Sequence, residues 1–280
     1  MPIHTATLET KPLDPIGVEV LDLDLSRDID DARFAELRAL IMDEGLVLFR
    51  RQPLEDSVHA ALGLRLGRSE DFWRGDGSNE PVVIVISNVD AEEKVQPLDH
   101  FNMRTLEINE HWHTDSSFRE MPASFSLFAS VVAPPRGGDT FFASLRLGWE
   151  ELDEDAREEL YGVYAVHDYA TAFRRVIGET PPYIEEAPVR HPIVREHPET
   201  GRIGLYVTDH ACALEGFPRA EGRAKIESLV GWCTREGRVY RHHWEAGDLI
   251  IWDNRSMLHR AQGFDSRQPR VLRQVRIAGQ

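Results

Sequence analysis

The sequence predicts a mostly β protein with flanking helices, organised as a jelly-roll barrel that helices buttress. Two observations predict this class: many short runs of β-branched and aromatic residues are separated by turn residues, and helical patterns occur only at intervals between them. The chain has 280 residues, a length at which β barrels are often a single domain. Because it shows no internal repeat and no low-complexity linker, we expect one domain spanning residues 1–280.

The first half of the chain alternates between predicted strands and helices. Residues 17–23 alternate apolar and polar side chains, as an opening strand does. Residues 30–44 carry apolar side chains at helical spacing behind an aspartate, Asp30 or Asp31, that can cap the helix. The same rules predict a buried strand at 45–49, a second helix at 54–66 and a β-branched strand at 82–86.

The second half contains more strands and fewer helices. Residues 147–161 are rich in Glu and Asp and predict one surface helix, and residues 219–236 predict a helix that packs its apolar face. Residues 181–192 are interrupted by prolines and predict a loop. The strands predicted in this half lie at 124–132, 140–143, 203–207, 248–252 and 271–277.

The composition argues against nucleic acid and anionic membranes as partners. Lysine and arginine total 32 against 48 acidic residues, a formal net charge of −16, whereas those partners require a basic face. An anionic substrate would therefore need a local cluster of arginines. The N-terminal residues lack a signal or transit pattern, and no run approaches the roughly 18 apolar residues of a membrane helix. Because Cys212 and Cys233 have no metal-type spacing, we expect a cytoplasmic protein in a reducing compartment.

The segment His113-Thr114-Asp115 is the most informative stretch of the chain. On a β-strand alternate residues point the same way, so His113 and Asp115 would project from one face. A third metal ligand can then come from His111 on the same face or from a distant histidine, such as His259. Two histidines and one carboxylate with an open opposite face are the arrangement that holds non-haem Fe(II) for oxygen chemistry.

Five further motifs accompany this segment in order along the chain. They are Ile86-Ser87-Asn88-Val89, Asn109-Glu110-His111-Trp112 running into His113, Pro134-Pro135-Arg136-Gly137-Gly138-Asp139-Thr140, Glu196-His197-Pro198-Glu199-Thr200-Gly201-Arg202, and Gly247-Asp248-Leu249-Ile250-Ile251-Trp252-Asp253-Asn254-Arg255 running on to His259 and Arg270. Together they resemble the taurine dioxygenase/2,4-dichlorophenoxyacetate dioxygenase family of Fe(II)- and 2-oxoglutarate-dependent oxygenases. The resemblance covers nearly the whole chain.

The resemblance implies a double-stranded β-helix core with the metal at its mouth, and it places the ligands at His113, Asp115 and His259. Arg270 follows His259 at the family's spacing for the arginine that holds the distal carboxylate of 2-oxoglutarate. A guanidinium is a bidentate and permanently charged partner for a carboxylate. Thr140 matches the hydroxyl that shares this carboxylate.

The substrate residues are less strongly indicated. Asn109 and Ser116 match positions that face the substrate in the family. Members that bind anionic substrates carry a second arginine where this chain has Gln274. Strand alternation places Arg276 on the same face as Gln274 and Arg273 on the opposite face, so Arg276 can reach an acidic substrate.

The resemblance implies a dioxygenase that hydroxylates a small acidic organic substrate such as an aryloxyalkanoate, with C–O or C–S bond cleavage where the hydroxyl is unstable. Asp115 implies hydroxylation, because relatives that chlorinate carry a small residue there. Two alternatives stay open, a biosynthetic hydroxylase or desaturase of an amino acid or natural-product scaffold, and a non-catalytic metal-binding ligand sensor. The expected partners are Fe(II), 2-oxoglutarate, dioxygen and the small-molecule substrate. Homo-oligomers are common among relatives.

Overall fold

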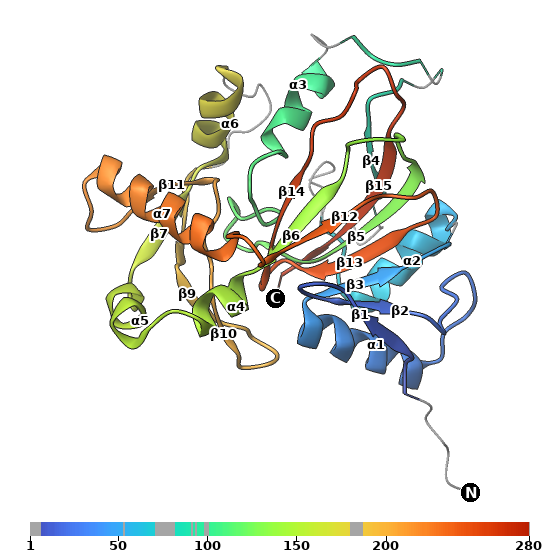
Figure 1. The fold of residues 1–280 in the computed structure, drawn as a ribbon, viewed down its shortest axis with the longest axis horizontal. Coiled ribbons are helices and arrows are strands. Elements are labelled where there is room, and N and C mark those ends of the chain that lie inside the picture. The colour runs from blue at the N-terminus through green and yellow to red at the C-terminus, as the bar shows by residue number, and fades with distance from the viewer. Residues whose placement is uncertain are drawn as a thin grey trace, which may run out of the picture.

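The computed structural model consists mainly of β-sheets with helices packed around them (Figure 1). It describes residues 7–279 except 53, 71–81, 91, 93, 98–100 and 180–186. The helices are α1 (Asp31–Glu44), α2 (Asp56–Leu66), α3 (Phe101–Ile108), α4 (Leu145–Glu150), α5 (Glu154–Leu160), α6 (Tyr169–Ile177) and α7 (Arg219–Cys233). Among the described residues, none of these helices has the length and apolar character needed to span a membrane.

The strands form four sheets. They are β1 (Thr10–Pro12), β2 (Val18–Val20), β3 (Leu46–Phe49), β4 (Ile84–Ser87), β5 (Ala123–Val132), β6 (Thr140–Ser144), β7 (Tyr164–His167), β8 (Val189–Pro192), β9 (Val194–Glu196), β10 (Ile203–Leu205), β11 (Ala211–Leu214), β12 (Val239–His242), β13 (Leu249–Asp253), β14 (Met257–Ala261) and β15 (Val271–Ala278). Seven strands form the largest sheet, in the order β1-β2-β3-β13-β5-β15-β4, and a second sheet has the order β12-β6-β14. The small sheets β11-β7-β8 and β10-β9 lie with α4, α5 and α7 to the left in Figure 1.

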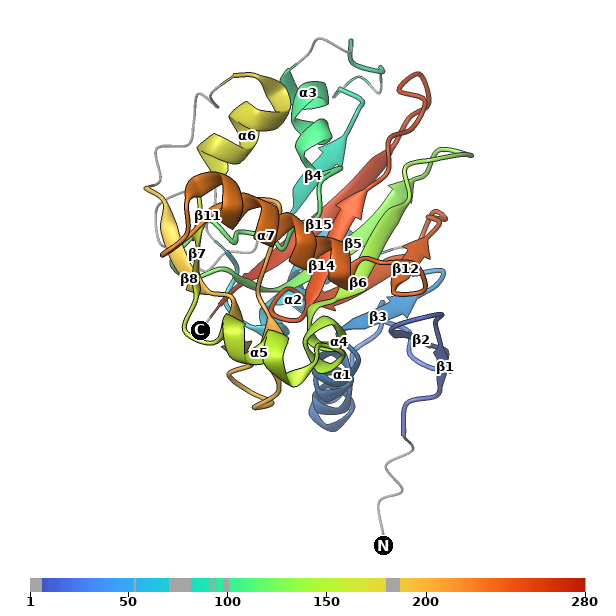
Figure 2. The same ribbon diagram turned by 60° about the vertical axis from the view of Figure 1, so that its left-hand side comes forward.

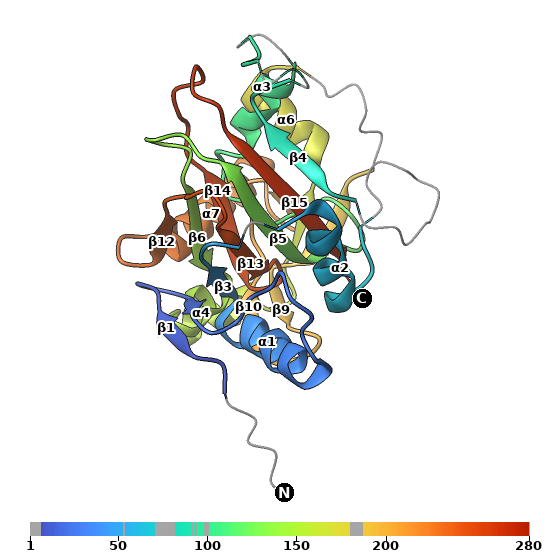
Figure 3. The same ribbon diagram turned by 90° about the vertical axis from the view of Figure 1, so that its right-hand side faces the viewer.

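The strand β3, an inner strand of the largest sheet, is buried on both faces, which explains its uninterrupted apolar sequence. Leu46 and Leu48 belong to the core between the largest sheet and the β12-β6-β14 sheet, where Trp252 of β13 also lies. Val47 and Phe49 point to the opposite face and pack with residues of α1 and α2. Figure 3 shows these two helices covering that face of the sheet. The apolar run at 45–49 therefore predicted a strand correctly, because both of its faces are covered.

The first helix begins and ends where the sequence predicts. The carboxylate of Asp30 accepts a hydrogen bond of 2.8 Å from the backbone N–H of Arg33, which makes Asp30 the N-cap. At the other end Gly45 has a φ of 80° and donates its N–H to the carbonyl of Ile41 over 2.8 Å. This left-handed conformation favours glycine, and it turns the chain directly into β3.

The structure corrects the predictions for residues 147–161 and 181–192. Residues 147–161 form two helices, α4 and α5, because the side chain of Asp153 accepts from the N–H of Ala156 and starts a new helix. Residues 181–192 were expected to be a loop, but Val189–Pro192 pairs with β7 as strand β8; residues 181–186 lie outside the described residues. Pro192 is tolerated because it occupies the last position of a three-stranded sheet's outer strand, where a missing N–H is not needed.

Buried histidines make the fold sensitive to acid. Burial lowers the pKa of His59 to about 4 and the pKa of His167 to about 3. The unfolded chain therefore binds more protons than the folded chain between pH 6.5 and these values, so the free energy of unfolding must fall as the pH decreases. The free energy of unfolding falls by about 1.4 kcal/mol per histidine for each unit by which folding lowers its pKa. Urea unfolding at a series of pH values between 7 and 4.5 measures it.

A variant of His59 provides the control for this prediction. His59→Leu removes one buried imidazole from the apolar side of the sheet, and it should flatten the dependence of the unfolding free energy on pH. An unchanged slope in this variant would contradict the assignment of the acid sensitivity to buried neutral histidine.

Candidate active site

A cavity of about 600 Å³ lies among α3, β4, β15, the start of α6 and the loop that follows β14. Its apolar wall includes Ile84, Ile86, Met103, Phe118, Phe128, Tyr169 and Phe264. Its polar wall includes Asn109, His113, Asp115, Ser116, Thr140, His210, His259, Arg270, Gln274 and Arg276. The volume is in the range of small-molecule sites, and the cavity brings together every residue that the sequence predicts for the metal, the cosubstrate and the substrate.

Three buried side chains in this cavity offer donor atoms that lie within 4.8 Å of one another, His113, Asp115 and His259. A backbone bridge joins the two histidines, because the N–H of His113 donates to the carbonyl of His259 over 2.9 Å and the N–H of His259 returns the bond over 2.8 Å. Oδ1 of Asp115 lies 3.8 Å from Nε2 of His259. Segments far apart in sequence thus meet as a ready set of metal ligands.

The segment around His113 is not the strand that the sequence predicts. Only His113 forms an isolated bridge, and residues 115–118 form a turn in which Ser116 has a φ of 56°. The N–H of Asp115 bonds to the side chain of Asn254 over 3.1 Å instead of to a neighbouring strand. His111 therefore does not share a strand face with the other two, and it is not part of the ligand group.

His111 instead contributes its backbone. Nδ1 of His113 donates to the carbonyl oxygen of His111 over 2.7 Å, which fixes the tautomer and leaves Nε2 available to a metal. Burial lowers the pKa of His113, and it lowers the pKa of His259 to about 3. Burial alone would raise the pKa of Asp115. Attraction to His259 and His113 when they are protonated, the charge of Arg276 and the hydrogen bond from Ser126 hold it below its usual value. At neutral pH the group is two neutral imidazoles and one carboxylate.

Neutral donors orient the Asp115 carboxylate. Its Oδ2 accepts from the hydroxyl of Ser126 over 2.5 Å and from Nε2 of Gln274 over 2.9 Å. The amide of Asn254 donates to Ser126 over 2.9 Å and completes this network. Because Oδ2 already has two donors, Oδ1 is the oxygen left for a metal ion.

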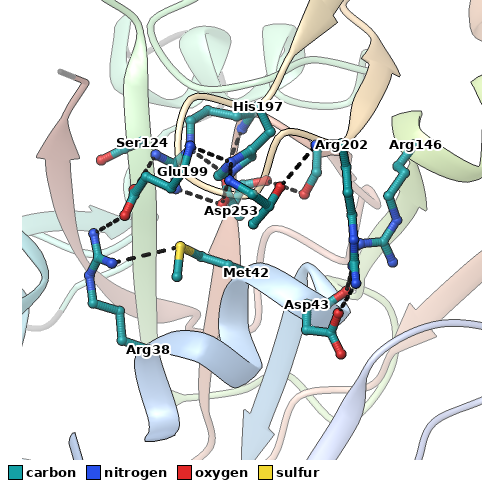
Figure 4. A network of polar contacts seen from close by, with 12 residues as sticks. Arg38, Met42, Asp43, Ser124, Arg146, His197, Glu199, Arg202 and Asp253 are labelled. Atoms are coloured by element: carbon teal, nitrogen blue, oxygen red, sulfur yellow. Dashed lines mark hydrogen bonds and ion pairs between the residues drawn. The ribbon is translucent and has the colours of Figure 1, made fainter. Parts of the chain in front are cut away.

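A second polar network holds Asn254 in place through its chain neighbour Asp253. The neighbouring Asp253 accepts from Nε2 of His197 over 2.9 Å and from Arg255 over 2.7 Å. Glu199 binds Arg255 and also Arg38 of α1, which ties this network to the first helix (Figure 4). None of these residues lines the cavity. The motif at 196–202 is therefore structural, and it holds the end of β13 from which Asn254 reaches Asp115.

Arg270 presents a buried positive charge to the cavity. Its side chain donates through Nε to the carbonyl of Gly138 over 3.1 Å, and its backbone N–H is held by Asn88 over 2.7 Å. Burial lowers the pKa of the guanidinium to about 10. Arg270 forms no ion pair with a carboxylate in the described part of the chain, and Thr140 lines the same wall. Burying a guanidinium costs free energy unless a negative charge lies near it. Asp139 supplies such a charge from beyond ion-pair distance, and an anion bound in the cavity would add a direct partner.

Arg276 lies on the cavity wall beside Ser116, to whose hydroxyl it donates over 3.3 Å. Its Nε also lies 3.2 Å from Oε2 of Glu70, a buried carboxylate that the sequence analysis did not single out. Arg273 points away and binds Asp56 on α2 over 2.5 Å. The alternation along β15 therefore places the side chains as the sequence predicts. The sequence did not predict that Glu70 partly neutralises Arg276.

His210 is a cavity residue that the sequence did not indicate. Its ring stacks on that of His113 with centroids 5.1 Å apart, and neither ring nitrogen has a hydrogen-bond partner among the described residues. Burial holds the pKa of His210 well below its usual value. No motif surrounds it, because it reaches the cavity only through the pairing of β11 with β7.

Comparison with known proteins gives a consistent result. Residues 9–276 match the family model described as taurine catabolism dioxygenase TauD, TfdA family. The chain is 36% identical to the alpha-ketoglutarate-dependent 2,4-dichlorophenoxyacetate dioxygenase of Cupriavidus pinatubonensis, with 94% of each chain covered. It is 34% identical to the (S)-phenoxypropionate/alpha-ketoglutarate-dioxygenase of Delftia acidovorans, covering 94% of this chain and 92% of the relative.

A solved structure extends the similarity to three dimensions. The crystal structure of AAD-2 in complex with Mn(II) and N-oxalylglycine superimposes with a TM-score of 0.90 at 30% identity, with 98% of each chain covered. The family predicted from the motifs is therefore confirmed. The chain belongs to the TauD/TfdA family and is an alpha-ketoglutarate-dependent dioxygenase.

Proposed function

We propose that this dioxygenase hydroxylates a small organic acid of the aryloxyalkanoate type and thereby breaks its ether C–O bond. The observation that carries the proposal is one cavity that holds a His-Asp-His donor set, a buried arginine that forms no ion pair with any described residue, and a second arginine against an apolar wall. The relatives named for 2,4-dichlorophenoxyacetate and (S)-phenoxypropionate support this substrate class.

The donor set fits Fe(II). His113, His259 and Asp115 are two neutral imidazoles and a carboxylate, all buried and converging, and such a set with an open face suits non-haem iron. When bound, Fe(II) together with 2-oxoglutarate supplies the activation of dioxygen and the oxidation of a substrate C–H bond, with release of succinate and carbon dioxide.

The protein's own residues position the reactants. The guanidinium of Arg270 holds the distal carboxylate of 2-oxoglutarate, with the hydroxyl of Thr140 beside it. Gln274 and Ser126 hold Oδ2 of Asp115 and keep the carboxylate from rotating. The aromatic and aliphatic wall excludes water from the site, and Asn109, Ser116 and Arg276 face the substrate.

Succinate formation by the Fe(II)-loaded protein tests the function. The panel comprises aryloxyalkanoates, sulfonates, alkyl sulfates and free amino acids, each supplied with 2-oxoglutarate and oxygen. We expect strong coupling of succinate release to an aryloxyalkanoate, with a phenol as second product. The absence of succinate with every compound would contradict the reaction class.

A second substrate class is favoured by one specific contact. Glu70 shares the charge of Arg276, and Gln274 uses its amide nitrogen on Asp115, so the cavity attracts an anionic group less strongly than two arginines would. A biosynthetic hydroxylase or desaturase of a zwitterionic amino acid, or of a natural-product scaffold without a strong anion, fits this wall. Coupled turnover of an amino acid in the same panel would support it.

Replacing Arg276 by alanine tests the contact with an acidic group. Loss of a charge-assisted hydrogen bond weakens binding roughly 10- to 100-fold. We therefore expect the KM for the best acidic substrate to rise by about that factor. The KM for 2-oxoglutarate should stay unchanged. Arg273→Ala is the matched control, because this neighbour points to the opposite face. An unchanged KM in Arg276→Ala would contradict the assignment.

Fold, assembly and location belong to the same proposal. The two facing sheets support a double-stranded β-helix, or jelly roll, within a single domain spanning the chain. The net charge of −16 supports an enzyme that acts on small molecules without nucleic acid or membrane partners. The cysteine usage supports the cytoplasm as its location, and homo-oligomers are common among relatives. Sedimentation of the purified protein measures the oligomeric state.

A further inference from the structure

A second cavity of about 600 Å³ lies on the other side of α6 from the active site. It is bounded by α6, the strand β11 and the start of α7, which lie side by side in Figures 1 and 2. Four of its lining residues are arginines, Arg174, Arg175, Arg219 and Arg223. In a chain with a net charge of −16, this concentration of guanidinium groups around one groove has no role in the mechanism described above.

The described acidic groups near this groove pair with Arg223 but form no ion pair with Arg219. Oδ1 of Asp209 is 2.8 Å from Arg223, and its Oδ2 accepts from the backbone N–H of Trp112 over 3.1 Å. Arg175 binds the backbone carbonyl of Asp209, and the negative charge of this one carboxylate acts on both Arg223 and Arg175. Arg219 forms no ion pair with any residue that the structure describes.

The guanidinium groups also crowd one another. Partial burial and the nearby charge of Arg223 lower the pKa of Arg175, and the charges of Asp209 and Glu227 offset this only in part. A further negative charge in the groove would therefore stabilise the protonated form of Arg175. Glu227, one turn further along α7, accepts from Nε of Arg223 over 2.9 Å. It does not line the groove.

The backbone at the groove adds to this environment. Ala220 lines the groove in the first turn of α7, and the N-cap residue Pro218 makes no side-chain hydrogen bond to that turn. The first N–H groups of a helix need an acceptor and carry a partial positive charge. In this groove the first N–H groups of α7 add their partial positive charge to the charge of the arginines.

We propose that this groove is a binding site for a small multivalent anion, a phosphate or polycarboxylate, held by Arg175 and Arg219. Arg223 forms part of the groove wall, where it is already bound by Asp209, Glu227 and the carbonyl of Ala211. Planar guanidinium groups bind both kinds of anion through paired hydrogen bonds. The proposal is independent of the substrate of the active site. An acidic segment of another protein copy is a different class of occupant, and the experiment below separates it.

Titration of the full-length protein with pyrophosphate and with tricarballylate distinguishes the phosphate from the carboxylate source. Calorimetry at fixed ionic strength should show saturable binding of at least one of them, with a Kd of roughly 1 mM or below. In the double variant Arg175→Gln/Arg219→Gln the Kd should rise at least about tenfold. Arg27→Gln, an exposed arginine far from the groove in sequence, should bind like the wild type.

Arg270→Met separates this groove from the active site, because a carboxylate probe could also bind Arg270. Binding that persists in Arg270→Met and is lost in the double variant supports the groove. The proposal is overturned if both probes act only as sodium chloride does, or if binding is lost in Arg270→Met and kept in the double variant. A concentration-dependent increase in mass by light scattering, without anion binding, would assign the groove to a second copy instead.

Discussion

Replacing His113 by alanine is expected to abolish succinate formation, with a loss of roughly a thousandfold or more. Two ligands, His259 and Asp115, would remain, and neither backbone bond of the His113–His259 bridge uses the lost side chain. The protein should therefore fold normally but bind metal weakly. Calorimetric titration with Mn(II) measures the metal affinity separately from activity.

His111→Ala is the matched control for this variant. His111 supports His113 through its backbone carbonyl alone, so removing its imidazole should leave both metal affinity and turnover close to those of the wild type. Normal activity in His113→Ala combined with inactivity in His111→Ala would move the metal site away from the group described here.

The second large effect is expected at Arg270. Arg270→Met removes the buried guanidinium that faces the cavity, and loss of its paired charge-assisted bonds should raise the KM for 2-oxoglutarate by roughly 100-fold or more. The KM of Arg270→Lys for 2-oxoglutarate should lie between the values of the wild type and Arg270→Met. An ammonium keeps the charge, but it cannot form the planar pair of bonds or replace the Nε contact with Gly138.

Two further measurements make this prediction specific. Binding of 2-oxoglutarate should raise the melting temperature of the metal-loaded wild type but not of Arg270→Met, because only a ligand that binds the folded state stabilises it. Arg267→Met, an exposed arginine on the preceding loop, should respond like the wild type. A KM for 2-oxoglutarate that is unchanged in Arg270→Met would exclude this arginine as the anchor.

The local pattern of apolar and polar residues predicted those strands and helices that have other elements packed on both sides. The runs at 45–49, 248–252 and 271–277 correspond to β3, β13 and β15, because apolar continuity or alternation reflects the two faces of a sheet. The helix α6 and the strands β7 and β11 were not predicted. They are short, and their pairing depends on residues distant in the chain, which no local window contains.

The same distinction applies to the active site. The motifs indicated His113, His259 and Arg270, and the structure places all three in one cavity. Alternation failed at Asp115, because Asn254 captures its N–H and the chain turns at Ser116. Contacts that form only in the folded chain have no counterpart in local sequence. These include the stacking of His210 on His113 and the ion pair between Arg276 and Glu70.

The two donors on Oδ2 of Asp115 have a consequence for the evolution of this enzyme. Ser126 and Gln274 bind the same oxygen of Asp115. The effects of substitutions at Asp115, Ser126 and Gln274 must therefore be non-additive. Introducing arginine at position 274 would remove a neutral donor from Asp115 and place another cation beside Arg270 and Arg276. A change of substrate range through this position therefore requires coordinated mutations, and libraries that vary one site at a time would miss the productive combinations.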